Sequence, residues 1–339
     1  MIKNLHQFLK EQTKADNFSG AVLVAKNGQP IFEYSFGFAI KEKQIPNKID
    51  TKFNIGSMNK MFTGVAIAKL VEEKKLNFQD LIGKYLKKYP KKVAGKVTIH
   101  HILTHTEGFP SYFNKKYIVS RSKLKTINDY LELFKDESLL FEPGEKYQYS
   151  NSGYIVLGAI IEAITKQTYE NYVKENIFKI ANMGDTGLFE LDDPSLANGY
   201  TFRKPYSHEV SKTRRNNMEE LPQKGNPAGG GYSTCLDLLK FAQALLGNKL
   251  LSPEMTKLVL TPKEKVGTKE GQTLYYGYGF QILDVGDGHL RFGHAGGFAG
   301  VNGRLDMYPW RNLIVVVLSN YDEPAAFRIA NEATRLVIS

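Results

Sequence analysis

Strand-like segments at both ends of the chain, with helical segments between them, limit the folds that this sequence can adopt. Residues 20–37 contain two β-rich runs joined by Asn27-Gly28, a pair that tolerates the positive φ angles of a tight hairpin turn. Near the other end, four further runs have strand character: 276–284, 289–293, 299–307 and 313–319. Since no good alternating strand is seen between the two groups, we predict one antiparallel sheet built from both chain ends.

The middle of the chain has helical patterns and long polar loops. Residues 57–74 are apolar on most faces, which favours a helix buried inside the protein, with Ser57 at its N-terminus. Further helices are predicted at 153–165, 168–178 and 325–337. The predicted fold is α+β in one domain, 1–339: residues 1–78 and 228–339 form the sheet and its flanking helices, and residues 79–227 form a mostly helical subdomain.

Composition excludes several classes of protein. With 42% hydrophobic and 24% charged residues, and no run near the roughly 18 apolar residues of a membrane span, the chain reads as globular. Cys235 is the only cysteine, so no intrachain disulfide is expected. The net charge is +10, but the lysines are scattered and no nucleic-acid motif accompanies them, so nucleic-acid binding is not expected. The first residues lack a signal-peptide pattern, which favours the cytoplasm unless a leader was removed, and the oligomeric state stays open.

Ser57 and Lys60 form the pattern with the clearest chemistry. A serine hydroxyl is a weak nucleophile at neutral pH, and a partly desolvated lysine three residues later on the same helix can help to remove its proton. The same spacing recurs in a polar, lysine-rich stretch, where a lysine stays solvated, at Ser120/Lys123 and Ser122/Lys125. Only Ser57 begins an apolar helix, whose N-terminal dipole also favours an oxyanion. The context therefore selects Ser57 and Lys60.

Tyr149-Ser150-Asn151 is a second candidate motif, on a turn before the apolar helix that begins near Tyr154. Loops on a rigid scaffold commonly carry catalysis. Other Y-x-N matches, at Tyr112 and Tyr169, show that the pattern alone has little specificity, and a single buried tyrosine is by default a core residue. The motif gains weight only in combination with the others.

Gly293-His294-Ala295-Gly296-Gly297 is the third candidate motif. Paired glycines let a strand backbone approach a ligand closely, and a backbone N–H there could complete an oxyanion hole. The alternative is a glycine-rich turn with an incidental histidine.

In chain order, Ser57-x-x-Lys60, Tyr149-x-Asn151 and His294-x-Gly296 resemble the three active-site motifs of the serine β-lactamase and penicillin-binding-protein superfamily, nearest its class C-like branch. Longer stretches are similar to the same branch, so that the resemblance covers nearly the whole chain: TIHHILTHTEGFP (98–110), FEPGEKYQYSNSGYIVLGAIIEAIT (141–165) and AGGGYSTCLDLLKFAQALL (228–246). The fold that it implies is the β-lactamase/transpeptidase fold.

The resemblance also implies a role for each motif residue. Ser57 is then the nucleophile of an acyl-enzyme, and Lys60 and Tyr149 share the work of the general base. Asn151 positions the substrate amide or ester, and His294, Gly296 and Gly297 belong to the substrate-binding strand. The N–H groups of Ser57 and Gly297 form the oxyanion hole. The implied activity is that of a serine hydrolase for small esters, amides or peptides, with neither cofactor nor metal.

The third motif departs from the usual pattern. Lactamases and transpeptidases usually carry Lys-Thr-Gly there, whereas His294-Ala295-Gly296 stands in this chain and looks more like the D-aminopeptidases and other non-lactamase hydrolases of the branch. We therefore expect weak or no β-lactamase activity. Two alternatives stay open: a true class C-like β-lactamase, and a catalytically inactive binding or regulatory module that kept the fold.

Other constellations have less support. His101 and His105 are spaced i, i+4, but the sequence supplies no H-E-x-x-H and no third ligand, so zinc is not expected. No G-x-S-x-G nucleophile elbow occurs, which argues against an α/β-hydrolase, and no phosphate-binding glycine loop anchors nucleotide chemistry.

Overall fold

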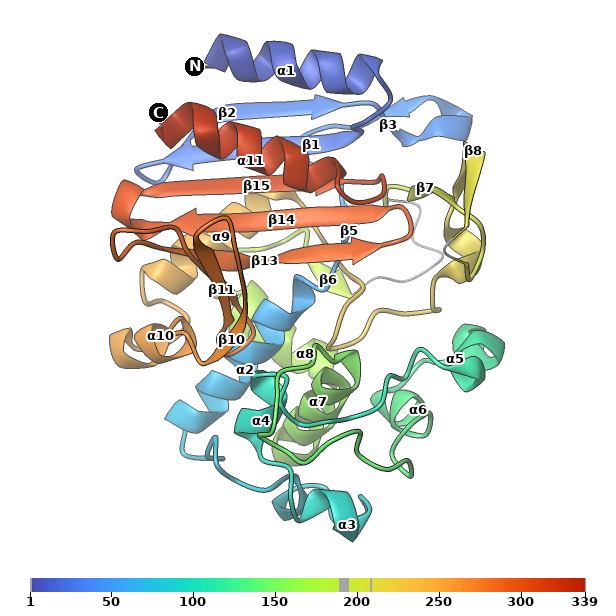
Figure 1. Cartoon of the computed structure of the whole chain (residues 1–339), viewed down its shortest axis with the longest axis vertical. Helices are drawn as coiled ribbons and strands as arrows, with labels where there is room; N and C mark the ends of the chain where they lie inside the picture. Colours follow the sequence, from blue (N-terminus) through green and yellow to red (C-terminus); the bar gives the residue numbers. More distant parts are fainter. Residues whose placement is uncertain (1, 189–194, 208, 339) are drawn as a thin grey trace.

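The computed structural model describes residues 2–188, 195–207 and 209–338, and its largest element is an eight-stranded sheet (Figure 1). The strands follow the order β10-β11-β12-β13-β14-β15-β1-β2, with every neighbouring pair antiparallel. Their bounds are β1 Gly20–Lys26, β2 Gln29–Phe36, β10 Glu264–Lys269, β11 Gln272–Tyr276, β12 Gln281–Asp284, β13 Leu290–Phe298, β14 Val301–Tyr308 and β15 Leu313–Ser319. Because β1 pairs with β15 along its whole length, the prediction of one sheet from both chain ends is confirmed.

The turns between strands match the sequence in some places and differ in others. Asn27 and Gly28 have φ angles of 51° and 78°, as the predicted hairpin turn requires. The single strand predicted at 276–284 is wrong, because a turn closed by the Gly277 N–H and the Phe280 carbonyl separates β11 from β12. The strand predicted at 289–293 continues to Phe298, so the glycine motif lies within β13.

Two layers of helices cover the sheet. Val22 and Val24 of β1 face the core under α1 and α11, whereas Ala21 and Leu23 face the larger core that contains α9. Both faces of the central strands are therefore buried, which explains why LIVVVLS at 313–319 is continuously apolar. Figure 1 shows α11 in front of the sheet and α1 along its β2 edge. The helices of these layers are α1 Ile2–Lys14, α9 Cys235–Leu246, α10 Pro253–Val259 and α11 Ala325–Ile338.

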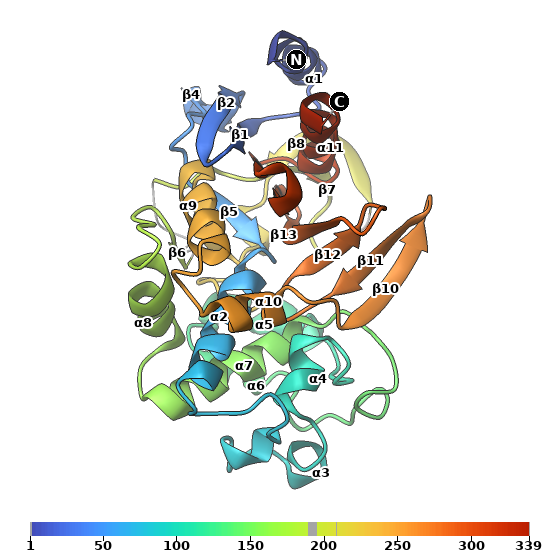
Figure 2. The same cartoon turned by 90° about the vertical axis from the view of Figure 1, so that its left-hand side faces the viewer.

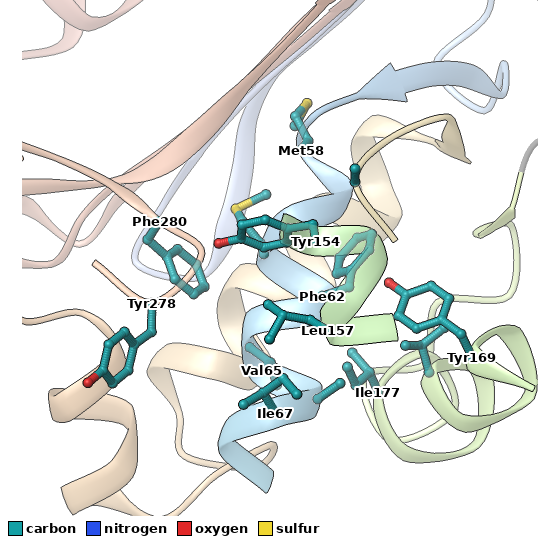
Figure 3. Packing of buried hydrophobic residues seen from close by; sticks show 14 of the residues in the cluster. Met58, Phe62, Val65, Ile67, Tyr154, Leu157, Tyr169, Ile177, Tyr278 and Phe280 are labelled. Carbon is teal, nitrogen blue, oxygen red and sulfur yellow. The ribbon is translucent and has the colours of Figure 1, made fainter. Parts of the chain in front are cut away.

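Helix α2, Asn59–Glu72, runs from the edge of the sheet into the helical part of the chain (Figure 2). Its Phe62 ring contacts Phe178 of the helical part and Phe241 of α9 at centroid distances of 5.0 and 4.9 Å. Figure 3 shows Phe62 and Val65 of α2 packed among Tyr154 and other apolar side chains. Helix α2 therefore packs against both the helical part and the helix α9 that covers the sheet, and it joins these two parts of the molecule.

The helical part surrounds the far end of α2. Its elements are α3 Lys91–Ala94, α4 Ile99–Leu103, α5 Lys115–Ser120, α6 Ile127–Leu131, α7 Asn151–Thr165 and α8 Tyr169–Val173, which continues as a π-helical turn over Lys174–Phe178. Single 3₁₀ turns occur at Lys41–Lys43, Ile82–Lys84, Arg121–Lys123, Met218–Glu220 and Pro309–Arg311. Among the described residues, no helix is both long enough and apolar enough to cross a membrane.

The middle of the chain also contains strands that the sequence did not suggest. Residues 195–207 and 209–217 include the strands of the hairpin β7–β8. They hydrogen-bond to the sheet side of the molecule, with the Tyr200 N–H donating to the Asn320 carbonyl at 2.7 Å. We therefore propose that the helical subdomain ends before residue 195 and not at 227. The remaining strands are β3 Phe38–Ile40, β4 Ile45–Pro46, β5 Phe53–Gly56, β6 Gly187–Leu188, β7 Tyr200–Arg203, β8 Val210–Asn216 and β9 Gly231–Ser233.

Candidate active site

Ser57 lies on the turn between β5 and the first helical residue of α2, where it is partly exposed. The preceding Gly56 has a φ of 51°, and a Cβ at that position would lie 3.0 Å from the backbone nitrogen of Gly297. A glycine is therefore required there for both reasons. The tight turn brings the start of α2 against β13.

Lys60 is fully buried one helical turn below Ser57. Its Nζ lies 3.2 Å from Ser57 Oγ, 2.6 Å from Asn151 Oδ1 and 2.5 Å from the Ala228 carbonyl oxygen. Burial lowers the pKa of this amine well below its usual value. A neutral amine has two N–H bonds and one lone pair, so donation to Asn151 and Ala228 leaves the lone pair for the Ser57 hydroxyl.

Tyr149 approaches the same hydroxyl from the loop before α7. It keeps 38% of its surface exposed, but its hydroxyl end is enclosed and shares a hydrogen bond with Ser57. Burial raises the pKa of Tyr149, so the phenol stays protonated at neutral pH. The Lys60 Nζ lies 4.9 Å from the centre of the Tyr149 ring. The three side chains thus form one connected group.

The N-terminus of α7 places Tyr149 and Asn151. Ser150 is the N-cap, and its hydroxyl accepts from the Gly153 N–H at 3.3 Å. The Ser150 N–H donates to His105 Nδ1 at 3.2 Å, and the His105 ring lies 4.4 Å from the Tyr149 ring. Burial lowers the pKa of His105 well below its usual value, so the ring is neutral and supports the loop. His101 instead closes the capping box of α4, and no cluster of potential metal ligands occurs among the described residues.

Glu107 is a further buried group beneath this helix end. A Cβ on Gly153 would lie 2.5 Å from Glu107 Oε1, so the carboxyl lies directly under the first turn of α7. Its side chain is fully buried, and neither carboxyl oxygen has a hydrogen-bond partner among the described residues. Burial raises the pKa of Glu107 to about 8, which keeps the acid mostly neutral at pH 7.

Gly296 and Gly297 of β13 have different surroundings. A Cβ on Gly296 would lie 1.9 Å from the Ile55 carbonyl oxygen, so Gly296 allows β13 to pack on β5 and does not face the pocket. Gly297 is exposed and lines the pocket beside Ser57, with its nitrogen close to Gly56. Ser57 and Gly297 therefore line the same pocket on either side of Gly56.

His294 differs from expectation in its surroundings. It is only 2% exposed, its Nδ1 lies 2.6 Å from the Ala295 carbonyl oxygen, and its Nε2 lies 2.8 Å from the Tyr276 hydroxyl. The carbonyl can only accept, so Nδ1 carries the proton and Nε2 accepts from Tyr276. Burial, with Lys60 nearby, lowers the pKa of His294 to about 3. We therefore propose that His294 and Gly296 do not contact the substrate and instead support the strand that lines the pocket.

The pocket beside Ser57 has walls that the motifs did not reveal. Asn151 and Gly297 line it as expected, together with Tyr112, Phe113 and Phe298. Phe113 and Phe298 come from opposite parts of the chain and stack at a centroid distance of 6.3 Å. In the sequence, Phe298 directly follows Gly297 of the third motif, and Phe113 lies within the Tyr112-x-Asn114 match; no other sequence feature indicated these two residues. No charged side chain lines this pocket among the described residues.

Comparisons with known proteins agree with this architecture. The chain is 28% identical to penicillin-binding protein 4* of Bacillus subtilis over 97% of its own length and 74% of the relative. It is 34% identical to a penicillin-binding protein of Bacillus halodurans, with a TM-score of 0.85 and 98% of each chain covered. A D-amino acid amidase of Ochrobactrum anthropi SV3, solved with L-phenylalanine amide, shares the fold at 21% identity, with a TM-score of 0.83 and coverage of 99% and 97%.

The fold and its relatives define the class as serine hydrolases of the β-lactamase/transpeptidase fold. The Beta-lactamase family model matches residues 5–338, and the chain belongs to that family.

Proposed function

We propose that this chain hydrolyses small uncharged esters and aminoacyl amides through a Ser57 acyl-enzyme, with little activity on β-lactams. The observation that supports this most is the Lys60 amine, which is buried and lies 3.2 Å from Ser57 Oγ, with two acceptors for its own hydrogens. A buried neutral lysine in this position is a competent base.

In the acylation step, the Ser57 oxygen forms a bond to the substrate carbonyl carbon while its proton moves to Lys60 Nζ. The Ser57 and Gly297 N–H groups donate to the oxyanion that develops. Tyr149, whose hydroxyl stays protonated, passes a proton to the leaving alkoxide or amine and is reprotonated from Lys60. The carbon–oxygen or carbon–nitrogen bond of the substrate breaks, and an ester of Ser57 remains.

In the deacylation step, a water molecule takes the place of the leaving group. Tyr149 takes the water proton as its own hydroxyl proton moves to the neutral Lys60 amine, and the water oxygen bonds to the acyl carbon. The bond between Ser57 Oγ and the acyl carbon then breaks, and Ser57 recovers its proton from Lys60 as the acid leaves. No step needs a redox change. The reaction is therefore acyl transfer to water.

The pocket favours acyl groups that carry no negative charge. Its walls are aromatic and carry no charged side chain among the described residues, and the third motif presents no cation, because His294 is buried and neutral. A β-lactam carries a carboxylate next to its ring, and this pocket offers nothing to neutralise it. The fold shared with a D-amino acid amidase is consistent with small amide substrates.

The test combines a probe and a substrate panel. A fluorophosphonate probe should label one serine, and Ser57→Ala should abolish both the labelling and the hydrolysis of p-nitrophenyl butyrate. Ser120→Ala, in the exposed S-x-x-K match, is the matched control and should behave as wild type. Folded wild-type protein that resists the probe would indicate a binding module, and nitrocefin turnover near the ester rate would indicate a β-lactamase.

A further inference from the structure

Glu323, just before α11, is the acidic group nearest to the exposed face of Gly297. A Cβ on Gly297 would lie 3.7 Å from Glu323 Oε2, and Gly297 itself lines the pocket beside Ser57. The carboxylate therefore stands at the rim of the pocket, next to the strand that would hold the substrate.

Glu323 has no ion pair or side-chain hydrogen bond among the described residues, although it is exposed and the chain carries 45 lysines and arginines. Its neighbour Asp322 shows the contrast. Asp322 accepts from the Phe202 and Gly300 N–H groups at 2.9 and 2.8 Å, and it lies 3.7 Å from Arg214. Asp322 thus stabilises the local structure, whereas the Glu323 carboxylate is exposed to solvent beside the Ser57 pocket.

The rest of the pocket supplies a place for an apolar side chain. Phe113 and Phe298 stack across the opening, and Phe298 directly follows Gly297 on β13. An α-aminoacyl group carries its ammonium one bond from the carbon next to the carbonyl, and its side chain leaves from that same carbon. A carboxylate at Gly297 and an aromatic wall beside it match these two substituents.

We infer that Glu323 is a specificity-determining residue that binds the free ammonium group of an aromatic aminoacyl substrate at the rim of the Ser57 pocket. This inference rests on the proposed function, because it names the substrate class of the same site. It predicts that aminoacyl amides with a free amine are preferred over the same amides with the amine acetylated.

The experiment compares kcat/KM for D-phenylalanine p-nitroanilide and its N-acetyl derivative. We expect the wild type to prefer the free amine, and Glu323→Gln to reduce that preference about three- to tenfold, the scale of a solvent-accessible charged contact. Glu323→Lys should reverse the ranking and favour an N-succinyl derivative. The matched control is Glu73→Gln, the same change in an exposed carboxylate at the opposite end of α2, which should leave the preference unchanged.

Two outcomes would overturn the inference. One is a wild-type preference for the acetylated substrate; the other is a preference for the free amine that survives both Glu323 variants. Hydrolysis of p-nitrophenyl butyrate in the same preparations separates this failure from failure of the proposed function. Suppose that ester cleavage depends on Ser57, but the ratio of kcat/KM for the free-amine and N-acetyl anilides is the same in the wild type and the Glu323 variants. Then only the assignment of the ammonium site to Glu323 is wrong. If neither compound is cleaved, the proposed function fails.

Discussion

At the scale of single residues, we propose that Lys60 and Tyr149 act on the same proton. Both side chains contact Ser57, and the amine lies 4.9 Å from the tyrosine ring. We predict that Lys60→Ala and Tyr149→Phe each lower kcat for p-nitrophenyl butyrate at least about a hundredfold, and that the double variant loses little more, because either change disables the same unit. Single-turnover and steady-state rates measure this. A double loss equal to the product of the two single losses would contradict a shared relay.

The lowered pKa of Lys60 gives a second prediction at this scale. Acylation requires the neutral amine, so kcat/KM for an uncharged ester should rise with pH through the Lys60 pKa and then level off below the usual range of a lysine near 10.4. The neighbouring His105 and His294 have lowered pKa values and stay neutral over this range, so they add no inflection. A kcat/KM that keeps rising tenfold per pH unit up to pH 10 would show an ordinary, solvated lysine.

The sequence predicted which candidate residues lie close together better than it predicted what surrounds them. Helix spacing and an apolar context were enough to select Ser57 and Lys60 from three S-x-x-K matches, because both signals are local. The burial of His294 could not be predicted, since it depends on the Tyr276 hydroxyl and on the depth of β13 in the sheet. Motifs give residue types in order, but they do not say which face of a strand is covered.

At the scale of elements, Glu107 under the first turn of α7 makes stability depend on pH. Its pKa is raised from about 4.3 in an unfolded chain to about 8, so the native state binds more protons than the unfolded state between these values. The free energy of unfolding therefore falls as pH rises through this window. We predict that Glu107→Gln removes this slope and stabilises the protein at pH 7.5 by about 1 to 3 kcal/mol.

Urea unfolding at pH 5.5 and pH 8 measures this effect. An exposed glutamate on the helical part, changed as Glu175→Gln, serves as the control and should keep the wild-type slope. Equal pH slopes in the wild type and Glu107→Gln would show that Glu107 ionises with its ordinary pKa, and hence that the carboxyl reaches water.

Elements with a long regular pattern were the most predictable. Helices α2, α7 and α11 lie within two residues of the predicted ranges, and the Asn27-Gly28 turn fixed the first hairpin. The hairpin β7–β8 was missed because its strands are polar and only partly buried, so no alternation of apolar residues marks them. Its position depends on pairing with residues far away in sequence, which local patterns do not encode.

At the scale of the whole molecule, α2 joins the sheet side and the helical side through one continuous core. Phe62 contacts aromatic rings of both sides, and β1 joins the N-terminal residues to β15. We therefore predict one cooperative unfolding transition. The single tryptophan, Trp310, lies between β14 and β15 and reports on the sheet, whereas ellipticity at 222 nm reports mainly on the helices.

The two signals should give the same urea midpoint within error. Two separated midpoints would show that the parts unfold independently, and would support a division of the chain into autonomous subdomains. This overall arrangement was predictable because strands at both chain ends must meet in one sheet. The boundary that we propose before residue 195 was not predictable, because residues 195–207 and 209–217 reach the sheet side through backbone hydrogen bonds, which amino-acid composition does not reveal.

The contact between Gly296 and the Ile55 carbonyl has a practical meaning for protein engineering. Any side chain at 296 would push β13 away from β5, and with it the amide of Gly297 from that of Ser57. In the proposed mechanism the groups that stabilise the oxyanion are main-chain amides, whose placement depends on glycines, whereas Phe113 and Phe298 line the pocket that would hold the substrate's substituents. On this proposal, main-chain amides support the reaction, and the aromatic side chains of Phe113 and Phe298 determine selectivity. We therefore expect that a mutant library at Phe113 and Phe298 changes which acyl groups are accepted and leaves the acyl-transfer reaction unchanged.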